Sequence, residues 1–350
     1  MSVTNGGANN SVSSPPRQLL QSTLSTTHLS AAWYVTSPQD INALEKIRFN
    51  LFFLDRSDYA TLSSTQRDSF IQQNINAMAA GSQLVLPIDN FLAKNWSDTD
   101  GMERFLYKWG NNPRIYGFML KDDVTTSTYP GAVGTDSTAL WKYRWYYHMI
   151  RNDSIITGIS NTYHMDLAPS KQIIVTLGFD PAGQNSINSY HYYIRPEFIP
   201  NFPSDFLTPH HAWDIIMPYW YPHRTQITQV NEDYLMSVLY PEMYNAFQGC
   251  IIPIIQTAAE NNSGLYLLEH DNYDNSNEPH GYNLSIQYNK FLQYGLVKNI
   301  PNTAAIAYYS ANGHSGVYDN LLHKNYVWDT SSANIYYQQA LILNNYHFQQ

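Results

Sequence analysis

The fold of this chain is decided by the stretch Ile115-Tyr-Gly-Phe-Met-Leu-Lys-Asp122-Asp123. Its first six residues are apolar or aromatic apart from one glycine, as in strands of a parallel sheet that are covered on both faces. Two adjacent aspartates follow, where this strand leaves the core. Either one of these carboxylates is stabilised by an interaction partner, or the pair takes part in a reaction. At the C-terminal end of an α/β-barrel strand, such a pair would lie where active sites are built.

Other stretches along the chain have the same character: they are short, apolar and rich in β-branched or aromatic residues. Together with the first stretch they predict strands at 31–36, 49–54, 83–88, 115–120, 172–178, 214–219, 250–256 and 304–309. Stretches with helical period lie between most of them, at 64–80, 102–109, 137–150, 284–297 and 334–343, and a further helix begins at Pro38 with Ser37 as its N-cap.

This alternation of strands and helices predicts a parallel α/β fold, and its repeat number favours a single-domain (β/α)8 barrel over a doubly wound sheet. Long insertions at about 180–211 and 258–282 would follow the fifth and seventh strands, on the catalytic face of a barrel. Residues 1–30 are rich in Gly, Asn, Ser and Pro, and we expect them to form a flexible polar arm.

Composition narrows the classes of partner. The formal net charge of the 350 residues is −9, so nucleic-acid binding is disfavoured. No stretch approaches the roughly 18 apolar residues of a membrane span, and no secretion signal is recognisable. No glycine-rich phosphate loop suggests a cofactor, and the histidines His210, His211 and His223 lack metal-ligand spacing, so we expect neither cofactor nor metal. The compartment stays open, and the composition is compatible with an extracellular or virion protein; the oligomeric state is open too.

Acids and aromatic residues gather at the predicted strand ends. Aromatic rings stack on the C–H faces of sugars, carboxylates and amides bond to sugar hydroxyls, and glycosidic hydrolysis needs a pair of carboxyl groups. The alternative for any single acid is a structural one, since an acid after a barrel strand often caps the next helix. The acids are Asp55, Asp89, Asp122, Asp123, Asp180 and Glu260, and the aromatic residues are Trp33, Tyr34, Trp220, Tyr221, Tyr308 and Tyr309.

Residues 114–123 form an apolar segment that ends in two acids, and residues 213–222 contain Asp214 followed by an apolar run that ends in Tyr221-Pro222. Further on come a strand with Gln256 near its end (253–257), a helix (284–294) and a strand that closes on aromatic residues (304–309). These parts resemble, in turn, the fourth strand, the sixth strand and the last third of glycoside-hydrolase-like (β/α)8 barrel proteins, whose fourth strand typically ends in Asp-Glu-Pro. The resemblance implies a carbohydrate-directed site. This chain departs from the family's pattern at two places. Asp123 and Val124 stand where Glu and Pro are expected. Gln256 stands where many retaining enzymes place a nucleophilic Glu, and a glutamine cannot act as that nucleophile.

The hypothesis that follows is acid/base hydrolysis of a glycosidic bond in an oligo- or polysaccharide. Asp122 or Asp123 would donate the proton, and Asp180, Asp89 or Glu260, in that order, would act as base or nucleophile. The substrate-binding residues would be Trp33, Tyr34, Asp55, Asp89, Trp220, Tyr221, Gln256 and Tyr308. The alternative is a non-catalytic barrel that binds glycans or builds an extracellular or virion surface.

Overall fold

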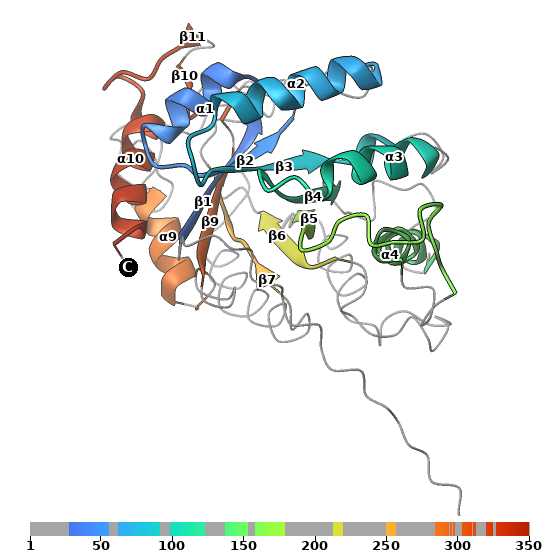
Figure 1. Cartoon of the computed structure of the whole chain (residues 1–350). Coiled ribbons are helices and arrows are strands. Elements are labelled where there is room, and N and C mark those ends of the chain that lie inside the picture. Colours follow the sequence, from blue (N-terminus) through green and yellow to red (C-terminus); the bar gives the residue numbers. More distant parts are fainter. Residues whose placement is uncertain are drawn as a thin grey trace, which may run out of the picture.

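Parallel strands form a nearly closed barrel with helices on its outside (Figure 1). The computed structural model describes residues 28–55, 62–91, 99–122, 137–152, 158–178, 213–219, 250–256, 284–293, 295, 297, 303–309, 311–312, 320–324 and 327–349. The strands of the barrel are β1 (His28–Val35), β2 (Leu51–Leu54), β3 (Gln83–Pro87), β4 (Ile115–Lys121), β5 (Gln172–Gly178), β6 (Ile215–Tyr219), β7 (Cys250–Ile251), β8 (Ile254–Gln256) and β9 (Ala304–Tyr309).

The segments β7 and β8 are two parts of one strand, broken at Pro253, which has no N–H to give to a sheet ladder. β7 pairs with β6 at one end, and β8 pairs with β9 at the other. The interrupted strand therefore joins the two sides of the sheet, because β9 pairs in turn with β1. This confirms the predicted (β/α)8 barrel and rules out the doubly wound sheet.

Helices cover the outside of the ring, as Figure 1 shows for α1, α2 and α3 on one side and α9 and α10 on another. Their bounds are α1 (Pro38–Glu45), α2 (Ser64–Ala77), α3 (Thr99–Trp109), α4 (Ser137–Arg151), α9 (Leu284–Gln293) and α10 (Ile335–His347), with a short 3₁₀ helix η2 (Asp89–Phe91) after β3 and a small antiparallel pair, β10 (His323–Lys324) and β11 (Val327–Trp328).

Most element boundaries fall within a few residues of those predicted. Ser37 caps α1 through its side chain, which accepts the N–H of Asp40, and Pro38 occupies the first turn as expected. β1 begins at His28, so the last three residues of the predicted arm belong to the barrel. Helix α2 ends at Ala77 rather than at residue 80, because Met78 already has an extended backbone.

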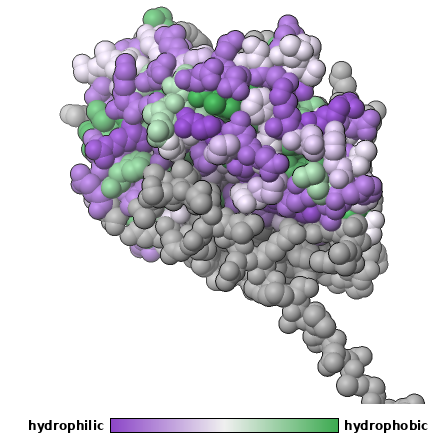
Figure 2. Space-filling view, viewed as in Figure 1, coloured by the Kyte–Doolittle hydropathy of each residue, from purple (hydrophilic) through white to green (hydrophobic). Residues whose placement is uncertain are grey.

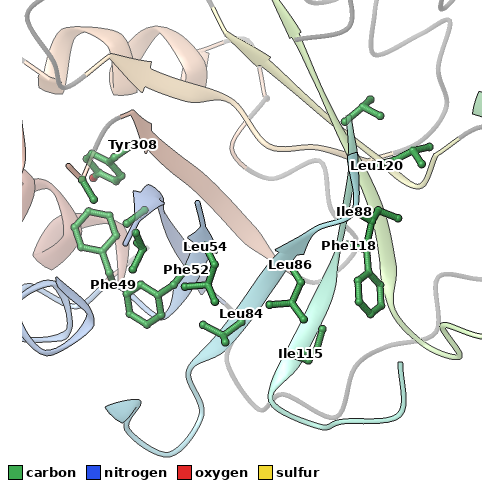
Figure 3. Close-up of a cluster of buried hydrophobic side chains, with 14 of the residues drawn as sticks. Phe49, Phe52, Leu54, Leu84, Leu86, Ile88, Ile115, Phe118, Leu120 and Tyr308 are labelled. Atoms are coloured by element: carbon green, nitrogen blue, oxygen red, sulfur yellow. The ribbon is translucent and has the colours of Figure 1, made fainter. Parts of the chain in front are cut away.

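Alternating side chains of the strands form two separate cores. One set faces the helices and packs with them; Figure 3 shows Phe52, Leu84 and Phe118 among its members. The other set faces the inside of the barrel and includes Ala31, Phe53 and Met217. A strand covered on both faces reads as a continuous apolar run, which is why these strands were recognisable from sequence.

The C-terminal helix α10 is tied to the barrel by a buried amide. Asn344 accepts hydrogen bonds from the Ser30 and Tyr308 hydroxyls, each at 2.8 Å, and its amide donates to the carbonyl of Ile47 at 2.8 Å. Burial raises the pKa of Tyr308 well above its ordinary value, so this hydroxyl remains a neutral donor. The network joins β1, β9, α10 and the segment after α1.

Gly117 in β4 is required by a close approach of two strands. A Cβ atom at this position would lie 2.3 Å from the backbone oxygen of Gln172 at the start of β5. We expect Gly117→Ala to lower the free energy of unfolding by about 1–3 kcal/mol, because backbone atoms must shift to admit the methyl group. Urea unfolding measures this change, and Asn111→Ala at an exposed position is the control. An unchanged midpoint would contradict the close approach.

The face of the molecule seen in Figure 2 is mainly hydrophilic, with small separate hydrophobic areas. Large exposed apolar or aromatic side chains in the described part of the chain are Tyr107, Met165, Val327, Ile342 and Tyr346. Within the same residues, no helix is both long enough and apolar enough to cross a bilayer.

Candidate functional site

The carboxylate of Asp122 is turned toward the inside of the barrel by a β-bulge. β4 carries one extra residue relative to β5, because Met119 pairs with Ile174 while Lys121 pairs with Val175. Without this extra residue, strict alternation from Met119, which faces inward, would point Asp122 outward. Instead Asp122 lies beside Thr176, whose hydroxyl donates to Oδ1 at 2.8 Å.

A second bulge places two aromatic side chains at the same end of β1. Ala32 pairs with Phe52 and Val35 pairs with Leu54, so Trp33 and Tyr34 together oppose one residue of β2. Tyr34 has a φ of 56°, in the left-handed region that a bulky side chain avoids at a cost of about 1–3 kcal/mol. Bulges of this kind commonly redirect side chains next to functional sites.

Tyr34 reaches from β1 toward the residue that follows β4. Its hydroxyl donates to Oδ2 of Asp122 at 3.4 Å, so both oxygens of that carboxylate accept hydrogen bonds from hydroxyl groups. The strands are parallel, and these contacts join their C-terminal ends, which is the barrel face where active sites form. Tyr34 and Asp122 are both partly exposed. We call this end of the barrel the mouth.

The buried aromatic residues Trp33 and Tyr309 pack against the partly exposed ring of Tyr34. Trp33 is 4% exposed and stacks on Phe53 with ring centroids 4.8 Å apart. Tyr309, at the end of β9, meets the ring of Tyr34 edge to face at 5.3 Å. Trp33 is thus part of the core inside the barrel, and Tyr34 is the more accessible of the two residues.

Hydrogen bonds from the segment after β9 hold the bulge of β1. The N–H of Ala311 donates to the carbonyl of Trp33 at 2.7 Å. One residue further on, the side-chain amide of Asn312 donates to Thr36 and to the buried carboxylate of Asp40. Asp40 also accepts the N–H of Thr36 at 2.8 Å. The backbone on both sides of Tyr34 is therefore fixed.

Two of the predicted acids, Asp55 and Asp89, lie at strand ends on the same face as Asp122. Asp55 directly follows β2, and its N–H donates to the carbonyl of Val35 at 3.0 Å. Asp89 begins η2 directly after β3 and is partly buried. Both are in position to flank the mouth.

Tyr308, expected at the mouth, is not there. Its side chain is completely buried on the outer face of β9, where it packs edge to face on Phe49 and bonds to Asn344. Its neighbour Tyr309 faces the inside of the barrel. The strand was correctly predicted and Tyr309, named there with Tyr308, does face inward, but the choice of Tyr308 as the substrate-binding residue was wrong.

Several predicted site residues lie outside the described residues. They are Asp123, Asp180, Trp220, Tyr221 and Glu260. The histidines His210, His211 and His223, which were not expected to bind a metal, lie outside the described residues too. Gln256 is the last residue of β8, where it pairs with Tyr309 in the ladder. Across the part of the chain that the structure describes, no group of three or more His, Cys, Asp and Glu residues could hold a metal ion.

Sequence reasoning overlooked Thr176, which is 1% exposed and bonded to Asp122. The sequence does mark this residue, because Thr176 is a polar residue between the apolar neighbours Val175 and Leu177 in β5. A hydroxyl inside such a strand needs a hydrogen-bond partner, and a carboxylate at the next strand end is a suitable one.

Asp214 and Arg151 form an ion pair at the opposite end of the barrel, before β6 begins. Arg151 donates to the carboxylate of Asp214 at 2.6 Å and to the carbonyls of Ala168 and Lys171. The Tyr147 hydroxyl donates to the other oxygen of Asp214 at 2.8 Å. Burial opposes the charge of Arg151, but the carboxylate of Asp214 outweighs it and raises the pKa of the guanidinium. Asp214 is therefore structural.

Comparison with known proteins shows the fold. No family model and no curated sequence matches this chain. A putative α-L-fucosidase from Bacteroides thetaiotaomicron shares the fold over 99% of each chain, with a TM-score of 0.53 and 8% identity. An endo-β-1,4-mannanase from Cellulomonas fimi covers 91% of this chain and 70% of its own, at 8% identity and a TM-score of 0.47. The Bacillus cereus spore cortex-lytic enzyme SleL covers 82% of this chain and 72% of its own, at 8% identity and a TM-score of 0.42.

Proposed function

We propose that this protein hydrolyses a glycosidic bond at the mouth of its barrel. The observation that carries the proposal is the carboxylate of Asp122, which faces inward at the end of β4 between the hydroxyls of Tyr34 and Thr176. The partly exposed ring of Tyr34 beside it offers a surface for the C–H face of a sugar. Cleavage of a glycosidic bond uses a pair of carboxyl groups, of which Asp122 would supply one, and the aromatic ring beside it would hold the sugar.

In the proposed reaction, Asp122 or Asp123 donates its proton to the oxygen of the leaving sugar as the bond from that oxygen to the anomeric carbon breaks. A second carboxylate activates water, or attacks the anomeric carbon itself and is later released by water. Asp180, Asp89 and Glu260 are the candidates for this second role. A separation of about 5 Å between the two carboxyl groups would give retention, and one of about 6.5–9.5 Å would give inversion.

Other residues would bind the saccharide without taking part in bond cleavage. Gln256 and Tyr221 are proposed to orient sugar hydroxyls through hydrogen bonds, and Trp220 is proposed to supply a further stacking face. Asp55 and Asp89 are the acids at the neighbouring strand ends. A site of this kind takes an oligo- or polysaccharide and requires no cofactor.

A panel of nitrophenyl glycosides and natural oligosaccharides tests the proposal. Fucosides belong in the panel because the putative fucosidase has the same fold. We expect turnover of at least one member, and product NMR would then report retention or inversion at the anomeric carbon. Saccharide binding without any turnover would support the alternative, a non-catalytic glycan-binding barrel.

The alternative has an observation in its favour. Gln256 ends β8, at the strand where retaining enzymes of the resembled group place a nucleophilic Glu. A glutamine can bind a sugar hydroxyl but cannot form a glycosyl ester. If neither turnover nor binding is detected with any member of the panel, both proposals fail.

A further inference from the structure

The described part of the mouth contains one strained residue, Tyr34, and that residue reaches the proposed catalytic carboxylate. Its backbone is left-handed, and the extra residue in β1 leaves Trp33 and Tyr34 opposite Phe53 alone. Backbone strain of this kind persists only where the surroundings enforce it. Here they do, through the bond from Ala311 to the carbonyl of Trp33 and the bond from Thr36 to Asp40.

The strained backbone has a specific consequence for Asp122. Tyr34 extends its hydroxyl to Oδ2, while Thr176 bonds to Oδ1 from the adjacent strand. Two donors on different strands fix both the rotation and the tilt of a carboxylate, whereas one donor leaves it free to turn. The orientation of a catalytic carboxylate affects the reaction rate strongly, because displacement of a reacting group by about 1 Å can lower the rate by a factor of about 100.

We infer that Tyr34 is a positioning residue, which holds the carboxylate of Asp122 in its reactive orientation together with Thr176. This inference rests on the proposed function, since the orientation matters only if Asp122 takes part in the reaction. It assigns the tyrosine a role other than stacking against the sugar. The aromatic ring stays in contact with Trp33 and Tyr309 whether or not the hydroxyl is present.

A double-mutant cycle separates positioning from the other roles of Tyr34. On a glycoside that the wild-type protein cleaves, Tyr34→Phe is expected to lower kcat about tenfold and to change KM less than threefold. In an Asp122→Ala background, the same change is expected to alter the residual kcat less than twofold, because the carboxylate is gone. A 2,4-dinitrophenyl glycoside, whose leaving group needs little protonation, keeps that residual rate measurable.

Two further variants test whether the effect of Tyr34→Phe depends on its contact with Asp122. Tyr107→Phe removes an exposed hydroxyl from α3 and is expected to leave kcat unchanged. Thr176→Val is expected to lower kcat as Tyr34→Phe does, again only when Asp122 is present. If Tyr34→Phe lowers kcat equally in both backgrounds, or changes only KM, the positioning role is overturned.

A second cycle needs no turnover and separates failure of this inference from failure of the proposed function. In urea unfolding, Tyr34→Phe is expected to lower the folding equilibrium constant about threefold in the wild-type background and to leave it within 1.5-fold in the Asp122→Ala background. If the protein cleaves no glycoside but unfolding shows this coupling between Tyr34 and Asp122, the proposed function is wrong and the contact between the two residues is supported. If the protein cleaves a glycoside but neither cycle shows coupling, the positioning role of Tyr34 is wrong and the proposed function stands.

Discussion

Replacing Asp214 with Ala is expected to lower the free energy of unfolding by about 3–5 kcal/mol, the usual cost of removing one partner from a buried ion pair. The guanidinium of Arg151 is buried, and Asp214 lies 2.6 Å from it. Asp166, at 3.6 Å, is too distant to replace that contact fully. The change would also deprive the Tyr147 hydroxyl and the N–H of Ile173 of their acceptor.

Asp100→Ala is the matched control for this measurement. Its partner Arg104 lies 3.6 Å away on the surface of α3, and both side chains are mostly exposed. Such a pair typically contributes less than about 1 kcal/mol. Urea unfolding of both variants should therefore separate them clearly. A loss below about 1 kcal/mol for Asp214→Ala would mean that the pair does not anchor β6 to α4.

Replacing Asp122 with Asn is expected to lower kcat about 10³-fold on the best glycoside of the panel, within the range of 10²–10⁴ typical of a lost acid or base. Asparagine has nearly the same shape and can still accept the hydroxyl bond of Thr176, but it cannot exchange a proton. Binding of the intact saccharide should change by less than about threefold, because the fold and the aromatic surface remain.

The substrate dependence of this variant identifies the role of Asp122. If it is the proton donor, the loss should shrink on a 2,4-dinitrophenyl glycoside, whose leaving group departs without protonation. If it is the base or nucleophile, the loss should be similar on both substrates. Asp100→Asn on the surface of α3 is the control. A wild-type kcat in Asp122→Asn, with a large loss in Asp123→Asn, would transfer the role to Asp123.

The sequence was sufficient for the barrel because each strand is covered on both faces and therefore reads as an apolar run. Even the interrupted strand was placed correctly, although its break at Pro253 was not expected. Pairing across that break depends on two different neighbours, β6 and β9, which no local pattern reveals.

The faces of the strands at the mouth were harder to predict. One extra residue in β4 decides that Asp122 faces Thr176, and no feature of Met119-Leu120-Lys121 marks it in the sequence. A bulge arises from the pairing of two strands, so it depends on residues far away in the chain. Tyr308 was misplaced for a different reason: every residue of β9 is apolar or aromatic and buried, so its sequence does not show that Tyr308 lies on the outer face and Tyr309 on the inner one.

The decisive experiment is a crystal structure of Asp122→Asn with an oligosaccharide that the wild-type protein cleaves. We expect a sugar in the barrel mouth beside Tyr34, with its glycosidic bond within about 3 Å of the side chain of residue 122. A saccharide bound away from the mouth, or a residue 122 that points away from a sugar bound there, would exclude Asp122 as a catalytic residue.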